Sequence, residues 1–295
     1  MIATLAFLII LAEGFARAKA ILHPETQGFP TYSQELWLRK YVHLNSLGFR
    51  DKQRTAQTGH EVRRILIVGD SFAFGAGIQD PEGRFGEQLE ERLGETHGRW
   101  EVINASRSDT HTLQHIEFLR SMLDFQPELV VLIYVFNDID YLRQVTRLSA
   151  LTGSILSVGR VLFLNSYLVQ ELYVRIRKIW LARASDDRYY PYDDIELLRK
   201  HLTDLRRFVS LAKENGAEVR IVPFSFQIEQ SDRTRYSRFF QLAMDFELPI
   251  CSLEGAFEGH SPGVLRVNSL DGHPSAYANG LAVEAALDCL ASASP

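Results

Sequence analysis

The chain has 295 residues, of which 46% are hydrophobic and 23% charged, an ordinary composition for a globular protein of one large or two small domains. Its formal net charge is -5 at pH 7, and no basic stripe or tail interrupts that balance. Nucleic-acid binding is therefore excluded as a function, because it requires a basic face.

The N-terminal 20 residues differ in composition from the rest of the chain. Residues 2–12 are almost entirely apolar, and charged residues follow them. This stretch is shorter than the about 20 residues that a membrane-spanning helix needs, but it fits the roughly 7 to 15 apolar residues of a signal peptide. Residues 16–18 and 18–20 both have the small-x-small pattern of a cleavage site. We therefore expect residues 1–20 to be a signal peptide or an N-terminal membrane anchor, with a first amphipathic helix as the alternative.

The next residues, 21–60, are polar and irregular, and we expect turns that wrap the domain. From Glu61 onward, short apolar runs alternate with segments whose apolar residues recur at helical spacing. The predicted strands cover residues 65–68, 100–105, 129–136, 217–223 and 249–253. The predicted helices cover residues 85–93, with Gly94 as a C-terminal cap, 112–125, 195–215, 235–246 and 275–290. This alternation indicates βαβ units, and right-handed crossovers then give a three-layer α/β/α sandwich with a central parallel sheet.

A long apolar and basic segment, residues 141–190, interrupts the alternation. Between Tyr141 and Ala184 one acidic residue, Glu171, stands against seven basic ones, namely Arg143, Arg147, Arg160, Arg175, Arg177, Lys178 and Arg183. A basic amphipathic element can lie on an anionic membrane surface. The alternative that we favour is a helical cap packed over the sheet. Residues 21–295 are thus expected to form one domain with a helical, basic insertion at about 141–190.

The first predicted strand delivers polar residues to its carboxyl end. Gly69, Asp70 and Ser71 follow the apolar run directly. Ligands of parallel sheets bind beyond the carboxyl ends of the strands, so Ser71 is a candidate nucleophile. A helix cap is the structural alternative for this Asp-Ser pair. Gly75 and Gly77 indicate a tight turn or a close approach of the backbone, because the Lys and Ser/Thr of a phosphate-binding loop do not follow them.

A serine nucleophile needs a base, usually a histidine oriented by an acid. His273 precedes the last predicted helix in the run Asp271-Gly272-His273-Pro274, and Pro274 suits the first turn of that helix. His273 is therefore expected on a loop beyond the last strand. Asp271 can fold back to accept a hydrogen bond from the other ring nitrogen.

The oxyanion of a tetrahedral intermediate needs preorganised donors. Asn137 follows the predicted strand 129–136, and Ser106 follows the predicted strand 100–105. The side chain of Asn137 and the backbone amides of Ser71 and Ser106 are the candidate donors.

The other histidines and the cysteines carry weaker signals. His111 and His115 are spaced as two metal ligands on a helix, but they lack the Glu of a His-Glu-x-x-His motif, and a solvated helix face is the expected alternative. Cys251 and Cys289 can form at most one disulfide and lack zinc-ligand spacing. We expect them to be buried small hydrophobic residues.

Taken in order, these segments resemble the SGNH (GDSL) hydrolases over roughly residues 45–295. Gly69-Asp70-Ser71-Phe72 is similar to the nucleophile block of that family, Asn137-Asp138 to the block that supplies the oxyanion Asn, and Asp271 with His273 to the block of the acid and base. The resemblance implies a flavodoxin-like sandwich with a Ser71/His273/Asp271 triad. It implies an oxyanion hole of Ser71, Ser106 and Asn137, and ester hydrolysis without a cofactor or metal.

Three positions depart from the family pattern. Ser106 and Val135 stand where the family usually has glycine, and the acid lies two rather than three residues before the histidine. A serine amide can still donate where its φ is negative, whereas Val135 and Phe136 would reshape the pocket wall.

The function expected from the sequence is a serine esterase acting through an acyl-enzyme on an O-acylated carbohydrate or a lipid ester. The alternatives are an O-acyltransferase with the same site and a noncatalytic envelope protein that binds glycan or lipid through a decayed site. We expect an extracytoplasmic location, whether periplasmic, secreted or membrane-anchored, with membrane association through residues 1–20 or the basic insertion. The insertion is also expected to form part of the substrate entrance, because it follows Asn137 directly.

Overall fold

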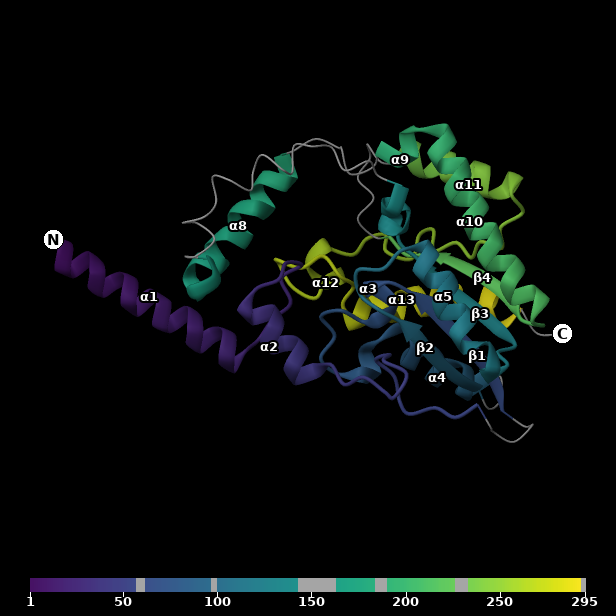
Figure 1. Ribbon diagram of the computed structural model, residues 1–295, viewed down its shortest axis with the longest axis horizontal. Coiled ribbons are helices and arrows are strands. Elements are labelled where there is room, and N and C mark those ends of the chain that lie inside the picture. The colour runs from purple at the N-terminus through teal and green to yellow at the C-terminus, as the bar shows by residue number, and fades with distance from the viewer. Residues whose placement is uncertain (57–61, 97–99, 143–162, 184–189, 226–232, 293–295) are drawn as a thin grey trace. The chain divides into compact units, whose positions relative to one another are not determined.

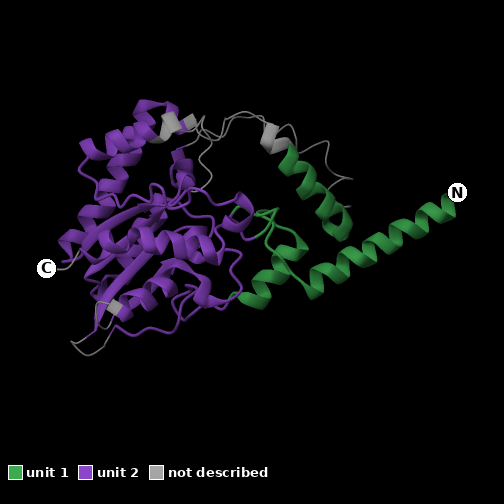
Figure 2. Cartoon of the chain, turned by 180° about the vertical axis from the view of Figure 1, so that it is seen from behind, with its two compact units in different colours: residues 1–42, 144–187, 268–272 green, residues 43–143, 188–267, 273–295 purple. Residues whose placement is uncertain are grey.

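The computed structural model describes residues 1–56, 62–96, 100–142, 163–183, 190–225 and 233–292 (Figure 1). The chain divides into two compact units, coloured separately in Figure 2. Unit 1 comprises Met1–Val42, Gln144–Asp187 and Asn268–Gly272, and unit 2 comprises His43–Arg143, Arg188–Val267 and His273–Pro295. Among the described residues, no helix combines the length and the apolar character that crossing a membrane requires.

Unit 2 is built on a parallel four-stranded sheet with the strand order β2-β1-β3-β4. These strands are β2 (Trp100–Ser106), β1 (Arg63–Gly69), β3 (Leu129–Tyr134) and β4 (Glu218–Pro223). Gly69 at the end of β1 is paired with Ser106 on one side and Ile133 on the other. The carboxyl ends of the three strands therefore lie side by side, as the sequence predicted. The fifth predicted strand is reduced to a single parallel bridge between Ile221 and Ile250.

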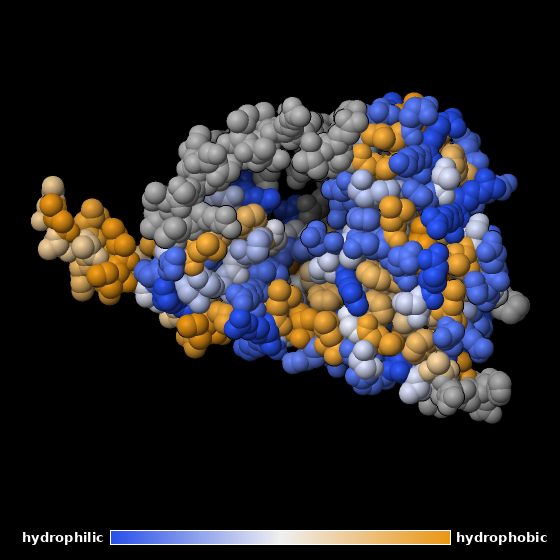
Figure 3. Space-filling view, viewed as in Figure 1, coloured by the Kyte–Doolittle hydropathy of each residue, from blue (hydrophilic) through white to orange (hydrophobic). Residues whose placement is uncertain are grey.

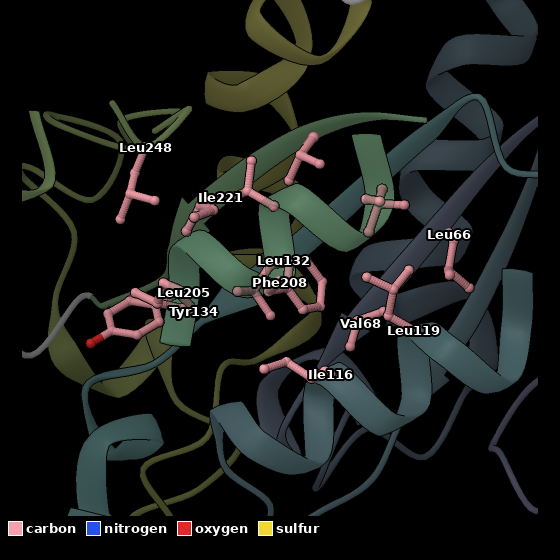
Figure 4. Packing of buried hydrophobic residues seen from close by; sticks show 14 of the residues in the cluster. Leu66, Val68, Ile116, Leu119, Leu132, Tyr134, Leu205, Phe208, Ile221 and Leu248 are labelled. Carbon is pink, nitrogen blue, oxygen red and sulfur yellow. The ribbon is translucent and has the colours of Figure 1, made fainter. Parts of the chain in front are cut away.

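Helices cover both faces of this sheet, because alternate residues of each buried strand face opposite sides. Leu66 and Val68 pack in one hydrophobic cluster with α5 (Thr112–Met122), α10 (Ile195–Glu214) and α11 (Arg233–Asp245), part of which Figure 4 shows. Ile65 and Ile67 pack in a second cluster with α4 (Phe85–Thr96) and α13 (Ala276–Ala291). The three-layer α/β/α sandwich predicted from the sequence is thereby confirmed.

Short helical segments complete unit 2. They are α3 (Ser71–Phe74), η1 (Pro81–Gly83), η2 (Leu123–Phe125), η3 (Phe136–Leu142), α9 (Tyr190–Asp193) and α12 (Pro262–Leu265). The third strand ends at Tyr134, two residues before its predicted end, because a turn follows. In this turn the Asp138 amide donates to the Val135 carbonyl (2.9 Å), and the Val135 amide donates to the Asp138 carboxyl (3.1 Å). Asn137 is consequently part of η3 rather than the residue that ends the strand.

Two predicted helix ends were wrong. Helix α4 continues through Gly94 to Thr96, so Gly94 is not its cap. Helix α13 begins at Ala276, and its N-cap is Ser275, whose hydroxyl accepts from the Ala278 amide (3.2 Å). Pro274 therefore precedes the cap instead of occupying the first turn.

The expectation of two unpaired cysteines was also wrong. Cys251 and Cys289 form a disulfide that closes 38 residues of sequence, with their Cα atoms 6.0 Å apart. Cys251 follows the bridge at Ile250 and Cys289 lies on α13, which packs over the same face of the sheet. The pairing depends on this long-range packing, which the spacing of the two residues in the sequence does not reveal.

Unit 1 contains α1 (Ile2–Leu22), α2 (Tyr32–Tyr41), α8 (Tyr167–Arg183) and the segment Asn268–Gly272. Helix α2 lies where only irregular chain was expected; the Thr31 hydroxyl caps it by accepting from the Gln34 amide (3.2 Å), and Trp37 is buried. Helix α8 lies within residues 141–190, the segment for which a helical, basic insertion was predicted. Arg143, Arg147 and Arg160 of that insertion lie outside the described residues.

Candidate active site

The Asp70 carboxylate is the centre of the polar cluster at the carboxyl end of β1. It caps α3, since its Oδ1 accepts from the Phe72 amide (2.9 Å). Its Oδ2 accepts from the Ser71 hydroxyl (3.1 Å) and from the Nδ2 of Asn137 (3.3 Å). Asp70 is buried, Ser71 is half-buried and Asn137 is exposed. The cap that was the structural alternative for this pair therefore exists, and the same carboxylate also joins Ser71 to Asn137.

His273 lies beside this cluster within unit 2. Its ring packs against Phe72 edge to face, with the ring centroids 5.6 Å apart. Its carbonyl accepts from the Val267 amide (3.0 Å), next to an antiparallel bridge between Arg266 and Pro274. His273 is thus on a loop before the last helix, as predicted, and adjacent to the residue that follows Ser71.

The two glycines after α3 form the tight turn that the sequence indicated. Gly75 ends α3 in the left-handed conformation with φ 73°, and a Cβ there would lie 2.6 Å from the Arg84 side chain. Gly77 has φ 84°, and a Cβ there would lie 2.6 Å from a methyl group of Val267. Glycine at 77 therefore lets Val267, and with it the backbone that holds His273, approach the turn after Ser71.

Asp271 belongs to unit 1, in the segment Asn268–Gly272. The Asn268 side chain organises this segment, because its Oδ1 accepts from the amides of Leu270 (2.8 Å) and Asp271 (2.9 Å). Its Nδ2 donates to the Thr26 carbonyl (2.9 Å). Asp271 itself is only 2% exposed. Sequence reasoning missed that Asn268 holds the backbone at Asp271, and the short run from Asn268 to Asp271 was the available signal for it.

Ser106 lies at the end of β2, buried and opposite Gly69. Its hydroxyl donates to the Asn104 side chain, whose Nδ2 in turn donates to the Ala73 carbonyl (2.7 Å). The Arg107 amide donates to the Gly69 carbonyl (3.4 Å). The Ser106 side chain is therefore connected to α3 through Asn104. The role of the Ser106 amide as an oxyanion donor stays a prediction.

Asp70 has a second buried carboxyl, Asp138, as its neighbour. Burial raises the pKa of Asp70, and the Phe72 amide and the charge of His273 oppose that shift. Burial and the neighbouring Asp70 raise the pKa of Asp138 well above its ordinary value. The fold therefore favours one negative charge over two on this pair of carboxyls. Asp70 is the better carrier of that charge, because it accepts hydrogen bonds from Ser71 and Asn137.

The expected solvated face was wrong for His115, which is fully buried. Its Nε2 lies 3.2 Å from the Thr110 hydroxyl, and its Nδ1 lies 3.9 Å from the Asp138 carboxyl. Burial and the nearby His111 lower the pKa of His115 to about 3, so the ring is neutral. Among the described residues, no group of three or more His, Cys, Asp or Glu side chains is arranged to hold a metal ion.

Arg50 is a further residue that sequence reasoning missed. It is buried, and its guanidinium donates to the carbonyls of Gly75 (2.6 Å) and Ile78 (2.7 Å). It therefore fixes the turn that follows Ser71. A single arginine in a run of turn residues gave no signal for this role.

No protein-family model and no curated protein matches the sequence. Among solved structures the chain is similar to TesA, with 16% identity and a TM-score of 0.51 over 79% of this chain and 100% of that chain. It is also similar to the lipase Lip_vut3 from a goat rumen metagenome, with 13% identity and a TM-score of 0.51 over 77% of this chain and 97% of that chain. At this identity the likeness concerns the fold. The shared fold is the α/β/α sandwich that the resemblance noted in the sequence implied.

Proposed function

We propose that this protein is a serine ester hydrolase with Ser71 as its nucleophile. The proposal rests on one observation: the side chains of Ser71 and Asn137 both donate hydrogen bonds to the Asp70 carboxylate. The His273 ring packs against Phe72, the residue that follows Ser71. A nucleophile, an amide donor and a base then lie at one edge of a parallel sheet. The description of the similar structure Lip_vut3 as a lipase supports the same class of reaction.

In the proposed reaction, the Ser71 hydroxyl turns from Asp70 toward His273 and attacks the ester carbonyl while its proton passes to the imidazole. The Asn137 side chain and the amides of Ser71 and Ser106 stabilise the oxyanion. His273 then protonates the leaving alcohol, and an acyl-serine remains. Water attacks this ester and gives a proton to His273, which passes it to the Ser71 oxygen as that oxygen leaves, so that the acid is released and the serine hydroxyl and neutral imidazole are restored. Asp271, two residues before His273 in the sequence, is the residue that we propose orients the imidazole.

As natural substrates we propose O-acylated carbohydrates or lipid esters outside the cytoplasm. The Cys251–Cys289 disulfide favours an extracytoplasmic location, because such bonds persist in oxidising compartments. The apolar residues 2–12 favour it as well.

The test is hydrolysis of p-nitrophenyl esters of increasing acyl length by the full chain and by Ser71→Ala. We expect the variant to lose several orders of magnitude in kcat/KM. Ser121→Ala is the matched control, since Ser121 lies exposed on α5. An alkyl fluorophosphonate should label the wild type and the control but not Ser71→Ala. Equal hydrolysis by wild type and Ser71→Ala would overturn the proposal. Acyl transfer to an added sugar, instead of release of the free acid, would identify a transferase.

A further inference from the structure

The Glu13 side chain, in the second half of α1, forms hydrogen bonds with the N-terminus of α8. The Glu13 carboxylate accepts from the Ser166 hydroxyl (2.7 Å) and from the amides of Tyr167 (3.1 Å) and Leu168 (3.0 Å). These are donors at the N-terminus of α8, so a residue of α1 caps that helix. Although burial acts in the opposite direction, these hydrogen bonds and Arg17 lower the pKa of Glu13 to about 2. The carboxylate is therefore charged throughout the physiological range.

Further contacts extend this attachment along α1. The Arg17 guanidinium donates to the Asn165 carbonyl (3.1 Å) and lies over the Tyr167 ring, 4.9 Å from its centroid. Lys19 pairs with Glu171 of α8 (3.5 Å). The charged half of α1 is thus an integral part of unit 1.

The first half of α1 has a different surface. Its large side chains are more than half exposed, and these are Ile2, Leu5, Phe7, Leu8, Ile9, Ile10 and Leu11. Residues 7–11 are consecutive and span more than one helical turn, so apolar side chains point to every side of the helix. Figure 3 shows this end of the molecule as a continuous hydrophobic surface near the N-terminus.

We propose that residues 2–11 of α1 insert into a lipid bilayer, and that α1 is retained in the mature protein as the element that joins unit 1 to the membrane. A protein groove takes up one stripe of a helix, whereas hydrocarbon accepts apolar side chains on all sides. Ten basic and seven acidic residues lie in the ranges of unit 1, although acidic residues outnumber basic ones in the whole chain. This excess of basic residues matches anionic headgroups.

Retention of α1 follows from the Glu13 contacts. Cleavage at residues 16–18 or 18–20 would remove Glu13 and leave the first amides of α8 without the carboxylate that caps them. The proposal is independent of ester hydrolysis, because none of these residues belongs to the proposed catalytic site.

The test is flotation of the full chain with vesicles of phosphatidylcholine, alone or mixed with phosphatidylglycerol. We expect binding to both, stronger to the anionic mixture. Leu5→Glu/Ile9→Glu should weaken it at least tenfold, because two large apolar side chains are replaced by charges. Met244→Glu/Val264→Glu is the matched control, since it adds the same charges at exposed apolar positions of unit 2. Hydrolysis of a soluble p-nitrophenyl ester should be equal in all three proteins.

Three results would overturn the proposal. The wild type could fail to float, or Leu5→Glu/Ile9→Glu could float as well as the control. Light scattering could show concentration-dependent oligomers that only this variant abolishes, in which case a second copy covers the helix. Retention has its own measurement: the tryptic peptide that ends at Arg17 should be found by mass spectrometry in protein purified from a secreting host. Absence of that peptide from a digest that otherwise covers the chain would refute retention.

Discussion

Replacing Asn137 with alanine should greatly slow ester hydrolysis while leaving the fold almost as stable as before. Asn137 is exposed, and its hydrogen bond to Asp70 is long, at 3.3 Å. Loss of one such bond costs about 0.5–1.5 kcal/mol of stability, and water can replace part of it. An oxyanion donor, by contrast, contributes roughly 10²- to 10³-fold in kcat, or about 2.7–4 kcal/mol of transition-state stabilisation. The catalytic effect should therefore exceed the structural effect severalfold.

The measurements are kcat and KM with p-nitrophenyl acetate, together with urea unfolding. We expect the loss in kcat with little change in KM, because the donor acts on the oxyanion and not on the ground-state carbonyl. Asn215→Ala is the control, since Asn215 is also exposed and its Nδ2 makes one hydrogen bond, to the Leu211 carbonyl (2.8 Å). A kcat for Asn137→Ala close to that of the control would refute Asn137 as an oxyanion donor.

Two further predictions concern stability. Burial raises the pKa of Asp70 in the folded chain, so the native state binds this proton more tightly than the unfolded state does. The free energy of unfolding of the wild type should therefore rise, relative to Asp70→Asn, as the pH falls through the raised pKa of Asp70 toward the ordinary carboxyl value of about 4. Urea unfolding at several pH values measures this difference. Asp245→Asn is the control, because it changes an exposed carboxylate. A difference in stability between wild type and Asp70→Asn that does not depend on pH would contradict the raised pKa of Asp70. The Cys251–Cys289 disulfide closes 38 residues, so the double alanine variant should lose about 4 kcal/mol. The same urea midpoint with and without dithiothreitol would show that no such bond forms in solution.

The sequence by itself determined the layers of the fold and the strand that presents Ser71. Strand β3 is a continuous apolar run, and β1 contains one at residues 65–68, whereas β2 is apolar apart from Glu101, Asn104 and Ser106. The helices that follow have apolar residues at helical spacing, so the type of each element is encoded locally. The strand ends were also readable, because Gly69, Ser106 and Asn137 each follow closely on an apolar run. Parallel strands place their carboxyl ends at one edge of a sheet, and this rule alone predicts that Ser71, Ser106 and Asn137, which follow three such strands, lie at the same edge.

Only the tertiary structure decided what depends on contacts between distant segments. The pairing of Cys251 with Cys289 follows from the packing of α13 over the sheet. The burial of His115 follows from its position beneath Asp138, which no helical spacing reveals. In the sequence, Glu13 marks only the end of an apolar segment. In the fold it caps α8, a helix that begins more than 150 residues later. Such contacts arise when the chain folds back on itself, so the identity of a residue and its near neighbours cannot specify them.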